Sequence, residues 1–249
     1  MSDEHVAKKA KPTPSTPLYS ELDLAKELAI EQTLQGAEIK HALVKYNGGR
    51  LAFQFEAASG SLRCPFGVDD GAKFNGKPSM NIELPPGQAA FQDKLEDLVK
   101  DAAVENKAVW FGSIKPPPSD ETVRESFNSR VKTDETGKYP PTLKVNVILN
   151  NIKVLTSRRL ANGKITKPQL ATVDAVVRGA RIVPVLRTAG GVWVSANAKK
   201  KTLEYGLVLE VFELLVIEEN AADSSVNFGG VEVASEDEGA NENGATAGA

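Results

Sequence analysis

The chain has 249 residues, 41% of them hydrophobic, and a formal net charge of −3, so it is long enough to bury one sizeable core. Its single cysteine, Cys64, excludes an internal disulfide and any zinc site built from several thiolates. It contains no run of about 18 apolar residues and no apolar leader, and we therefore expect a soluble, intracellular protein without a membrane span.

The first third of the chain predicts a short helix followed by two hairpins. Leucines at helical spacing predict a peripheral helix over residues 22–34. Residues 39–55 alternate around the turn Asn47-Gly48-Gly49, and Asn-Gly supplies the positive φ that a tight hairpin turn needs. A second hairpin is predicted at residues 74–77, ahead of a strand at residues 80–84.

A helical segment follows these hairpins. Residues 88–105 predict a helix, and Ser119 followed by two acids predicts the N-cap of a short second helix. Residues 109–112, Val-Trp-Phe-Gly, predict a compact aromatic element between them. The side chains predicted to share the buried face of the first helix are Phe91, Leu95, Leu98, Ala102 and Val104.

The second half of the chain predicts a return to strands. Turns are predicted at Asn162-Gly163 and Gly190-Gly191, and Pro184 indicates an edge position or a bulge within its strand. The predicted strands cover residues 143–149, 152–156, 173–177, 180–186 and 192–194.

The last strand is predicted over residues 203–216. Its alternation changes phase near Val211, which predicts a bulge or sharp bend there. A helix through the same residues is the alternative.

Together these elements predict a mainly β fold, a partly closed OB-like barrel with inserted α-helices and disordered termini. We expect a flexible basic arm with a short helix over residues 1–37, the barrel core with its helical insertion over residues 38–217, and a disordered acidic tail over residues 218–249.

Charge is strongly segregated along the chain. The tail from Glu218 onward holds eight acids and no lysine or arginine, so residues 1–217 carry +5. Residues 138–201 hold thirteen basic residues and one acid, Asp174, a net charge of +12. Such a segment favours a polyanionic partner and predicts binding that weakens with salt. A solvated basic face without a ligand is the alternative.

We expect this basic segment to bind single-stranded nucleic acid. Trp193 lies among cations in the sequence and is predicted to stack on an unpaired base, with a place in the core as the alternative. Trp110, Phe111, Tyr139 and Phe66 are less well placed for stacking, and for each of them a core position is predicted over a stacking one. The predicted nucleic-acid-binding residues are Lys144, Lys153, Arg158, Arg159, Lys164, Lys167, Arg178, Arg181, Arg187, Trp193, Lys199, Lys200 and Lys201.

Signatures of enzymes and cofactor sites are weak. Gly48-Gly49 and Gly190-Gly191 lack the spacing of a phosphate-binding loop, so turns are the better interpretation. Asp69-Asp70 and Asp134-Glu135 are paired acids of a kind that can hold Mg²⁺, but both lie in polar, turn-like segments. We therefore predict no catalytic residues, no metal site and no cofactor.

Four short motifs resemble a known family. They are Leu62-Arg63-Cys64-Pro65-Phe66-Gly67, Val109-Trp110-Phe111-Gly112, Tyr139-Pro140-Pro141-Thr142-Leu143-Lys144 and Gly191-Val192-Trp193-Val194. With the long final strand after them, they resemble the single-stranded DNA-binding proteins of large eukaryotic DNA viruses, which are similar to the OB-fold protein of short-tailed phages. The resemblance covers residues 38–217 as spaced motifs.

The resemblance implies an OB barrel that binds exposed strands during replication, recombination or repair. It also implies an acidic tail that competes with DNA and recruits replication proteins, with Glu236, Asp237 and Glu238 as the competing anions. The phage tail ends in an aromatic residue, whereas this one ends Thr246-Ala247-Gly248-Ala249, so direct docking of the tail onto a polymerase is not implied.

Two functions follow from these observations. The first is a non-enzymatic, sequence-nonspecific protein that binds single-stranded DNA, or RNA, and acts in the nucleus or at a viral replication site, as a monomer or a homodimer. The second is a structural or scaffold protein, virion- or chromatin-associated, whose basic face docks an acidic protein partner. A preference for single-stranded over duplex DNA separates the two.

Overall fold

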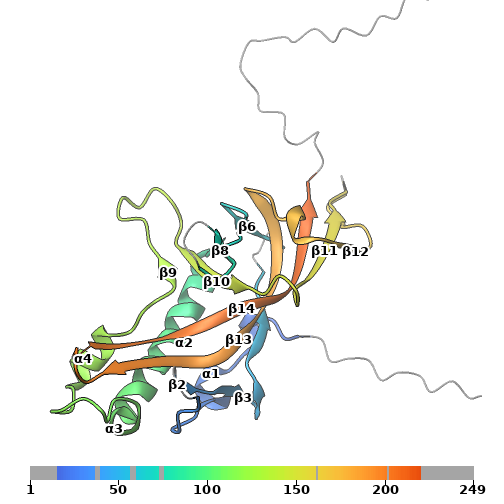
Figure 1. Ribbon diagram of the computed structural model, residues 1–249. Helices are drawn as coiled ribbons and strands as arrows, with labels where there is room; N and C mark the ends of the chain where they lie inside the picture. The colour runs from blue at the N-terminus through green and yellow to red at the C-terminus, as the bar shows by residue number, and fades with distance from the viewer. Residues whose placement is uncertain are drawn as a thin grey trace, which may run out of the picture.

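Two long antiparallel strands form the axis of the fold (Figure 1). The computed structural model describes residues 16–36, 40–56, 60–72, 76–160, 162–200 and 202–219. Strand β13 spans Ala180–Asn197 and strand β14 spans Thr202–Glu218. The two pair from Arg181 opposite Ile217 to Asn197 opposite Thr202.

Other strands assemble on both edges of this pair. Along β14 the order is β12-β11-β14-β10-β8-β7, while β13 also pairs with β2, β5 and β6 and β9 pairs with β10. The strands are β2 (Lys40–Ala42), β5 (Ala52–Gln54), β6 (Leu62–Cys64), β7 (Val68–Asp69), β8 (Ser79–Glu83), β9 (Val131–Lys132), β10 (Thr142–Val147), β11 (Lys153–Arg158) and β12 (Gln169–Ala171).

A smaller sheet contains the first predicted hairpin. It has the order β1-β3-β4, with β1 at Leu28–Ile30, β3 at Val44–Tyr46 and β4 at Gly49–Arg50. Asn47 and Gly48 take positive φ angles of 49° and 75° in the turn, as the Asn-Gly pair predicted. The second predicted hairpin corresponds to the antiparallel pair β7–β8, although residues 73–75 of its turn lie outside the described residues.

Two register shifts bend the long strand pair. Between Val185 and Leu186 the partners change from Glu213 to Val211, so Phe212 is the extra residue. This shift confirms the bulge predicted near Val211, and the alternative of a helix there is wrong. Pro184 lies next to the bulge but inside the sheet, because β13 is paired on both edges there.

The second shift corrects a prediction. Gly190-Gly191, predicted as a turn between strands, lies inside the continuous strand β13, at the irregularity between Thr188 and Val192. Both glycines have positive φ, of 75° and 84°. A Cβ at Gly191 would lie 2.1 Å from the carbonyl oxygen of Ala42, so only glycine allows this approach of β2 to β13.

Two other segments differ from their predictions. Helical spacing predicted one helix over residues 22–34, but α1 covers only Leu24–Glu27 and the chain then enters β1, because pairing with β3 overrides a weak local preference. Residues 173–177, predicted as a strand, contain the short 3-10 helix η3 (Val173–Ala175). Thr172 and Asp174 are hydrogen-bonded to each other at its start, and such local bonds favour a turn.

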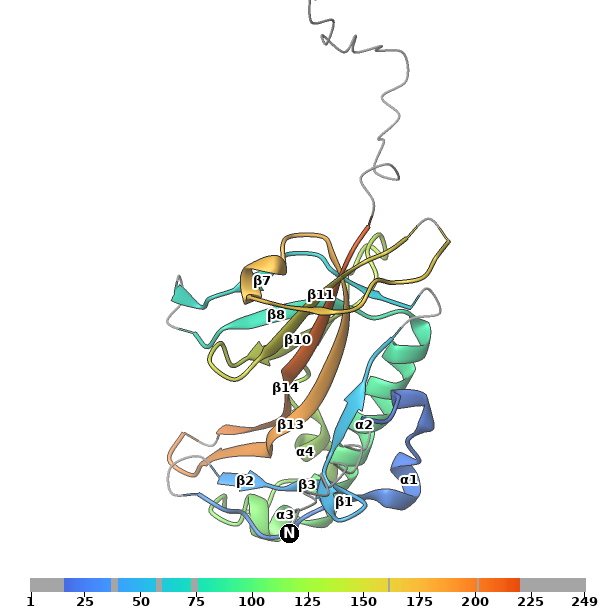
Figure 2. The ribbon, with the colours of Figure 1, turned by 90° about the vertical axis from the view of Figure 1, so that its right-hand side faces the viewer.

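The inserted helices lie between β8 and β9, and Figure 2 shows α2 along one side of the curved strand pair. They are α2 (Pro86–Glu105), α3 (Lys107–Trp110) and α4 (Asp120–Glu125), and the short 3-10 helix η1 (Tyr19–Glu21) precedes α1. Ser119 caps α4 as predicted, by accepting a hydrogen bond from the backbone N–H of Thr122 at 3.1 Å.

The buried face of α2 differs from the predicted one. Leu95 is buried as predicted, but Phe91, Leu98, Ala102 and Val104 are only partly buried. The fully buried side chains are instead Gln88, Gln92, Leu95, Glu96, Val99 and Ala103. Buried polar groups need partners: Gln88 donates to the carbonyl oxygen of Glu56, and Gln92 donates to Glu96 at 3.1 Å.

The core contains two aromatic clusters, and both include side chains of the helical insertion. Phe53, Phe55, Phe91 and Tyr19 meet edge to face near η1, with centroids 5.0–5.8 Å apart. Trp110, Phe111, Phe127 and Tyr205 form the other cluster, and burial raises the pKa of the Tyr205 hydroxyl.

The predicted mainly β class, an incompletely closed OB-like sheet with inserted helices, is confirmed. Within the described residues, no helix is both long and apolar enough to cross a membrane.

Candidate nucleic-acid groove

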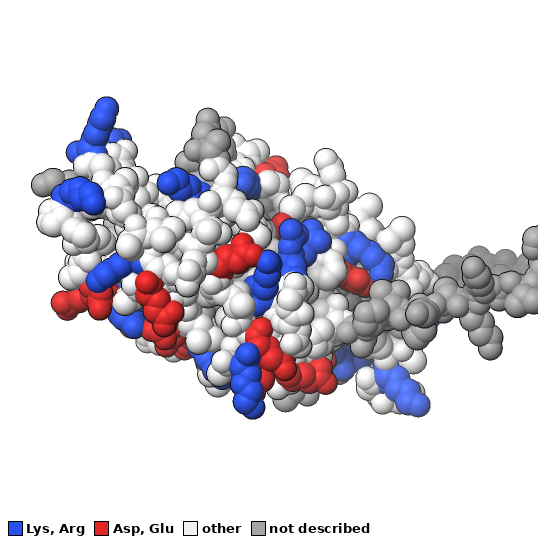
Figure 3. Space-filling view, turned by 90° about the horizontal axis from the view of Figure 1, so that it is seen from below, with Lys and Arg blue, Asp and Glu red and all other residues white. Residues whose placement is uncertain are grey.

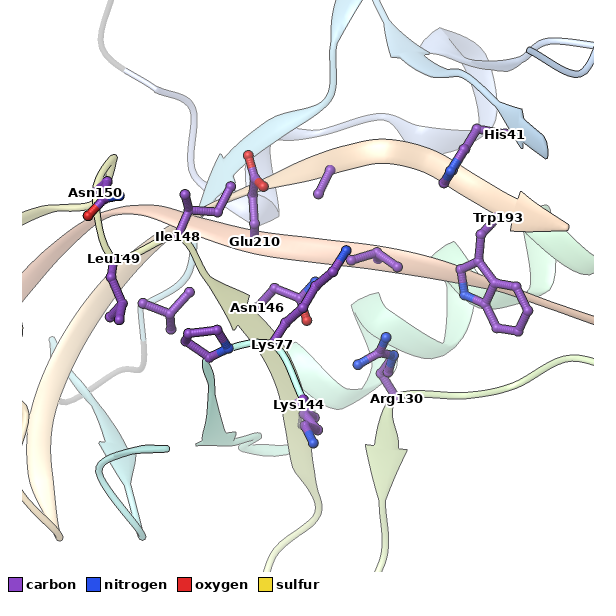
Figure 4. A pocket seen from close by; sticks show the side chains of 15 residues that line it. His41, Lys77, Arg130, Lys144, Asn146, Ile148, Leu149, Asn150, Trp193 and Glu210 are labelled. Atoms are coloured by element: carbon purple, nitrogen blue, oxygen red, sulfur yellow. The ribbon is translucent and has the colours of Figure 1, made fainter. Parts of the chain in front are cut away.

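A groove of about 850 Å³ lies over the outer face of β10 and one half of the β13–β14 pair. Figure 4 shows Trp193 and His41 at one end, Leu149 and Asn150 at the other, and Lys77, Arg130 and Lys144 between them. We call the groove and the part of the strand pair beside it, residues 187–197 of β13 and 202–210 of β14, the groove half. The rest of the pair, residues 180–186 and 211–218, together with strand β11 that pairs with it, is the far half.

Strand alternation explains which side chains face the groove. In β10, Leu143, Val145 and Val147 are buried, so Lys144 and Asn146 point to the opposite face. In β14, Leu207 and Leu209 enter the core, whereas Val208 and Glu210 line the groove. The groove therefore has a rigid floor, because it is the outer face of strands whose inner face is the core.

Trp193 is outside the buried core and lines the groove. In the strand register its neighbours are Gly206 of β14 and His41 of β2. A Cβ at Gly206 would lie 3.0 Å from Nε1 of Trp193 and 2.8 Å from the carbonyl oxygen of Asn128. The indole thus lies against a position that has no side chain, and we call Gly206 the seat of Trp193.

The other tryptophan, Trp110, is buried in the core. Trp110 is 2% exposed and its indole N–H donates to the carbonyl oxygen of Gln32 at 3.2 Å. Within the described residues, the N–H of Trp193 has no such partner. The prediction that Trp110 and Phe111 are core is confirmed, but Tyr139 and Phe66, also predicted as core, are 62% and 65% exposed, because both lie in loops outside the strand pairing.

Three cations from different segments converge on the groove. Lys77 precedes β8, Arg130 precedes β9 and Lys144 lies in β10. Strand pairing brings them together, and the backbone N–H of Lys144 donates to the carbonyl oxygen of Arg130 at 3.0 Å. In the described part of the chain none of the three forms an ion pair. Their charges are therefore available to a polyanion.

Arg187 does not line the groove itself but pairs with Glu210, which does. Its Nε donates to Oε1 of Glu210, which is nearly fully buried, and its guanidinium lies 5.1 Å from the centroid of the Phe212 ring. A buried carboxylate needs a compensating charge. Arg187 neutralises Glu210 and so adds little net charge to the groove.

Several predicted cations of the far half are paired with acids. Lys153 contacts Glu213 at 2.9 Å, Arg158 contacts Glu218 at 3.8 Å and Arg181 contacts Glu219 at 3.6 Å. The acids come from β14 and the residue after it. Figure 3 views the molecule from below relative to Figure 1, and on that face as well basic and acidic side chains are interspersed.

The remaining predicted residues are spread along the molecule. Lys164 and Lys167 lie in the connection from β11 to β12, where Arg159 bridges to Ile165. Arg178 precedes β13, and Lys199 and Lys200 lie in the turn from β13 to β14. Lys201, Glu236, Asp237 and Glu238 lie outside the described residues. Of the predicted set, the structure brings Lys144 and Trp193 together at the groove, and Arg187 contacts it through Glu210.

Sequence reasoning missed Lys77, Arg130, His41 and Asn146 as groove residues. Lys77 and Arg130 precede the basic segment, and only the pairing of β8 and β9 with β10 brings them to it. His41 is half-buried next to Gly190, and its Nδ1 has no hydrogen-bond partner among the described residues. The hairpin pattern around residues 39–55 was the available signal that His41 lies on a strand.

The paired acids serve local turns. Asp69 accepts a hydrogen bond from the backbone N–H of Gly71, and Asp70 accepts one from that of Ala72. In the described ranges, no group of three His, Cys, Asp or Glu side chains is arranged to hold a metal ion. Burial raises the pKa of the Cys64 thiol, which disfavours the reactive thiolate.

No protein-family model matches the sequence, and no curated protein matches it. Several solved structures of phage proteins are similar. The single-stranded DNA-binding protein from bacteriophage Enc34 in complex with ssDNA is 12% identical, with coverage of 76% of this chain and 96% of that chain and a TM-score of 0.38. A C-terminal truncation of the Enc34 protein is 13% identical, with 79% and 96% coverage and a TM-score of 0.37.

Gp2.5, a single-stranded DNA-binding protein encoded by bacteriophage T7, is 13% identical, with 67% and 91% coverage and a TM-score of 0.38. The similarity to phage proteins that the sequence motifs predicted is therefore found. The resemblance to the proteins of large eukaryotic DNA viruses stays a prediction. With TM-scores below 0.5, these similarities carry no argument for the function of this chain.

Proposed function

We propose that the chain binds single-stranded DNA, with low sequence specificity and without catalysis, along the groove between Trp193 and Leu149. The single observation that carries the proposal is the combination, in one groove, of a tryptophan outside the core and three cations that have no acidic partner among the described residues. Cations bind phosphates, and an accessible indole binds the face of an unpaired base.

The cations supply affinity without reading sequence. Lys77, Arg130 and Lys144 sit on separate elements along the groove and present charge to a passing phosphate backbone. Contacts to phosphates position a strand but carry no base information. The affinity that these contacts supply falls as salt rises, because binding releases counterions from the strand. The decrease is about 0.7 log units per contact for each tenfold rise in salt.

The tryptophan supplies the preference for single strands. In a duplex the faces of the bases are stacked on each other, so an indole in the groove can reach them only in an unpaired strand. The seat at Gly206 supports the indole from below, because a backbone without a Cβ lets the ring lie close to the strand. The N–H of Trp193, which has no hydrogen-bond partner in the described part of the chain, can donate to a phosphate or a base oxygen.

The test compares Trp193→Leu with the unaltered protein on a labelled oligothymidylate and on a duplex of the same length. We expect the variant to bind the single strand roughly 5- to 150-fold more weakly, the range for one stacked base, and to bind the duplex unchanged. Equal binding of both DNAs by the unaltered protein would contradict the proposal and favour the scaffold function. A third measurement with oligouridylate assigns the preference between DNA and RNA.

We further propose that the acidic tail competes with DNA and recruits replication proteins in replication, recombination or repair. Residues 220–249 hold six acids and no basic residue. Truncation after residue 219 keeps Glu218 and Glu219, which pair with Arg158 and Arg181. The truncated protein should bind an oligonucleotide more tightly and with a steeper salt dependence, and equal affinity in both forms would count against competition.

A further inference from the structure

The strands β9 and β10 form a hairpin that borders the groove and extends beyond it. Lys132 pairs with Thr142, and below this pair Arg130 and Lys144 face the groove. The loop of residues 133–141 closes the hairpin and protrudes from the body in Figure 1. We call residues 130–144 the finger. Its base carries two of the three groove cations.

One carboxylate orders the tip of the finger. Oδ2 of Asp134 accepts hydrogen bonds from the hydroxyl of Thr136 at 2.7 Å and from the backbone N–H groups of Lys138 and Tyr139 at 2.9 and 3.0 Å. Oδ1 accepts a further bond from the N–H of Thr136. These bonds, the Thr136 hydroxyl first, hold the pKa of Asp134 below its ordinary value. The loop is therefore tied in one conformation at neutral pH.

The ordered loop presents an aromatic ring and a cation. Tyr139 is 62% exposed, and Nζ of Lys138 lies 5.4 Å from the centroid of its ring. A single exposed aromatic residue is unremarkable by itself. Here the ammonium sits over the ring, and the backbone beneath both residues is fixed by Asp134. The pair reproduces, at the tip of the finger, the aromatic ring and cations of the groove.

We propose that the finger is a second stacking site for the same single strand, in which Tyr139 stacks on a base and Lys138 contacts a neighbouring phosphate. The inference rests on the proposed function of the groove. Tyr139 is five residues from Lys144, so their Cα atoms are at most about 18 Å apart. A strand must extend past the groove to reach both, and the contribution of the finger depends on oligonucleotide length.

The test measures binding of Tyr139→Ala to oligothymidylates of about 4 and about 16 nucleotides, the ends of the range of site sizes for single OB-like domains. We expect the long oligonucleotide to bind about 5- to 20-fold more weakly and the short one to bind unchanged. Tyr139→Phe should retain both affinities. Phe66→Ala, which removes an aromatic ring of similar exposure outside the finger, is the matched control and should alter neither affinity.

A second variant tests the cation. Lys138→Gln should lower the salt slope of the long oligonucleotide by about 0.7, one phosphate contact, and leave that of the short one unchanged. The exposed positions of both side chains predict unaltered unfolding temperatures, which a thermal melt verifies.

The outcomes separate the two proposals. If the unaltered protein binds neither oligonucleotide, the groove fails as a DNA site and the finger with it. If it binds both, but Tyr139→Ala changes neither affinity or weakens both by the same factor, the groove stands and the finger is overturned as a second site. Loss confined to the long oligonucleotide supports it.

Discussion

The two halves of the long strand pair contain the same kinds of side chain and use them differently. In the far half, Lys153, Arg158 and Arg181 form ion pairs with acids of β14 or of the residue after it. In the groove half, Lys77, Arg130 and Lys144 form no ion pair among the described residues, and the buried Glu210 in the same groove is neutralised by Arg187. The difference teaches that charge density along a sequence does not locate a basic surface, because the register decides which cations are compensated.

The comparison is tested most severely by removing the charges of each half. The variant Lys77→Gln/Arg130→Gln/Lys144→Gln should bind a single-stranded oligonucleotide roughly 100-fold more weakly at about 0.1 M salt, since three phosphate contacts are lost. Its salt slope should fall by about 2. A salt titration followed by fluorescence anisotropy measures both quantities.

The matched variant Lys153→Gln/Arg158→Gln/Arg181→Gln removes the same charge from the far half. It should retain most of the affinity, because these cations are already paired, and exposed pairs of this kind contribute only about 0–1 kcal/mol each to stability. Equal losses of affinity in the two triple variants would mean that binding follows total charge, and the distinction between the halves would be abandoned.

The seat of Trp193 gives the next largest effect. A Cβ at Gly206 would meet Nε1 of Trp193 and the carbonyl oxygen of Asn128 at 3.0 and 2.8 Å, so Gly206→Ala displaces the indole. We expect about 5- to 20-fold weaker binding of a single strand and a loss of about 1–3 kcal/mol of unfolding free energy from overpacking. Titration with an oligonucleotide and urea unfolding measure the two.

Gly49→Ala is the control for this change. Gly49 also lies in a strand, but a Cβ there would meet its nearest neighbour, the carbonyl oxygen of Tyr46, at an ordinary 3.7 Å. It should bind DNA normally. Should Gly206→Ala bind as well as Gly49→Ala, the orientation of the indole would be irrelevant to binding.

Local signals predicted local structure well. The Asn47-Gly48 turn, the Ser119 cap and the change of phase near Val211 are each encoded within a few residues, and each is present. The turn predicted at Gly190-Gly191 was wrong, because a glycine pair with positive φ fits a bulge within a strand as well as a turn. The approach of β2, which only a residue without a Cβ allows, decides between them.

The candidate site depended on contacts that local patterns do not encode. The sequence indicated a basic segment and Trp193, but the groove also draws Lys77 and Arg130 from outside that segment through the pairing of β8 and β9 with β10. The acids of the far half can be read directly from the sequence of the last strand and the residue after it. Which cation each of them would face follows only from the register of β11 and β13 against β14.

Glu210 offers a gain of function that sharpens the comparison. Glu210→Gln keeps an oxygen that can accept from Arg187 but leaves the guanidinium without a counter-charge, so the groove gains one positive charge. Affinity for a single strand should rise about fivefold at about 0.1 M salt, while stability falls by about 1.5–3 kcal/mol. Glu213→Gln, which frees Lys153 in the far half, is the control, and the proposed groove predicts no comparable gain from it.

The smallest effect concerns how the finger is attached to α2. Glu96 is buried and accepts hydrogen bonds from Gln92 at 3.1 Å and from the hydroxyl of Ser129, next to Arg130, at 3.0 Å. Burial raises the pKa of Glu96 above its ordinary value, so the folded state binds a proton more tightly than the unfolded state. Stability should therefore fall as pH rises from the ordinary pKa of the carboxyl through its raised value.

Glu96→Gln removes this titration and keeps an oxygen that can accept from Ser129. In thermal melts between pH 4 and pH 8, the stability of the variant should rise relative to that of the unaltered protein as pH rises. DNA affinity should change little, since no groove cation is altered. The far-half variant Glu213→Gln removes a partly exposed carboxylate that is paired with Lys153, and it should not reproduce the pH trend. A parallel pH dependence in Glu96→Gln and the unaltered protein would show that Glu96 pays no desolvation cost in the folded state.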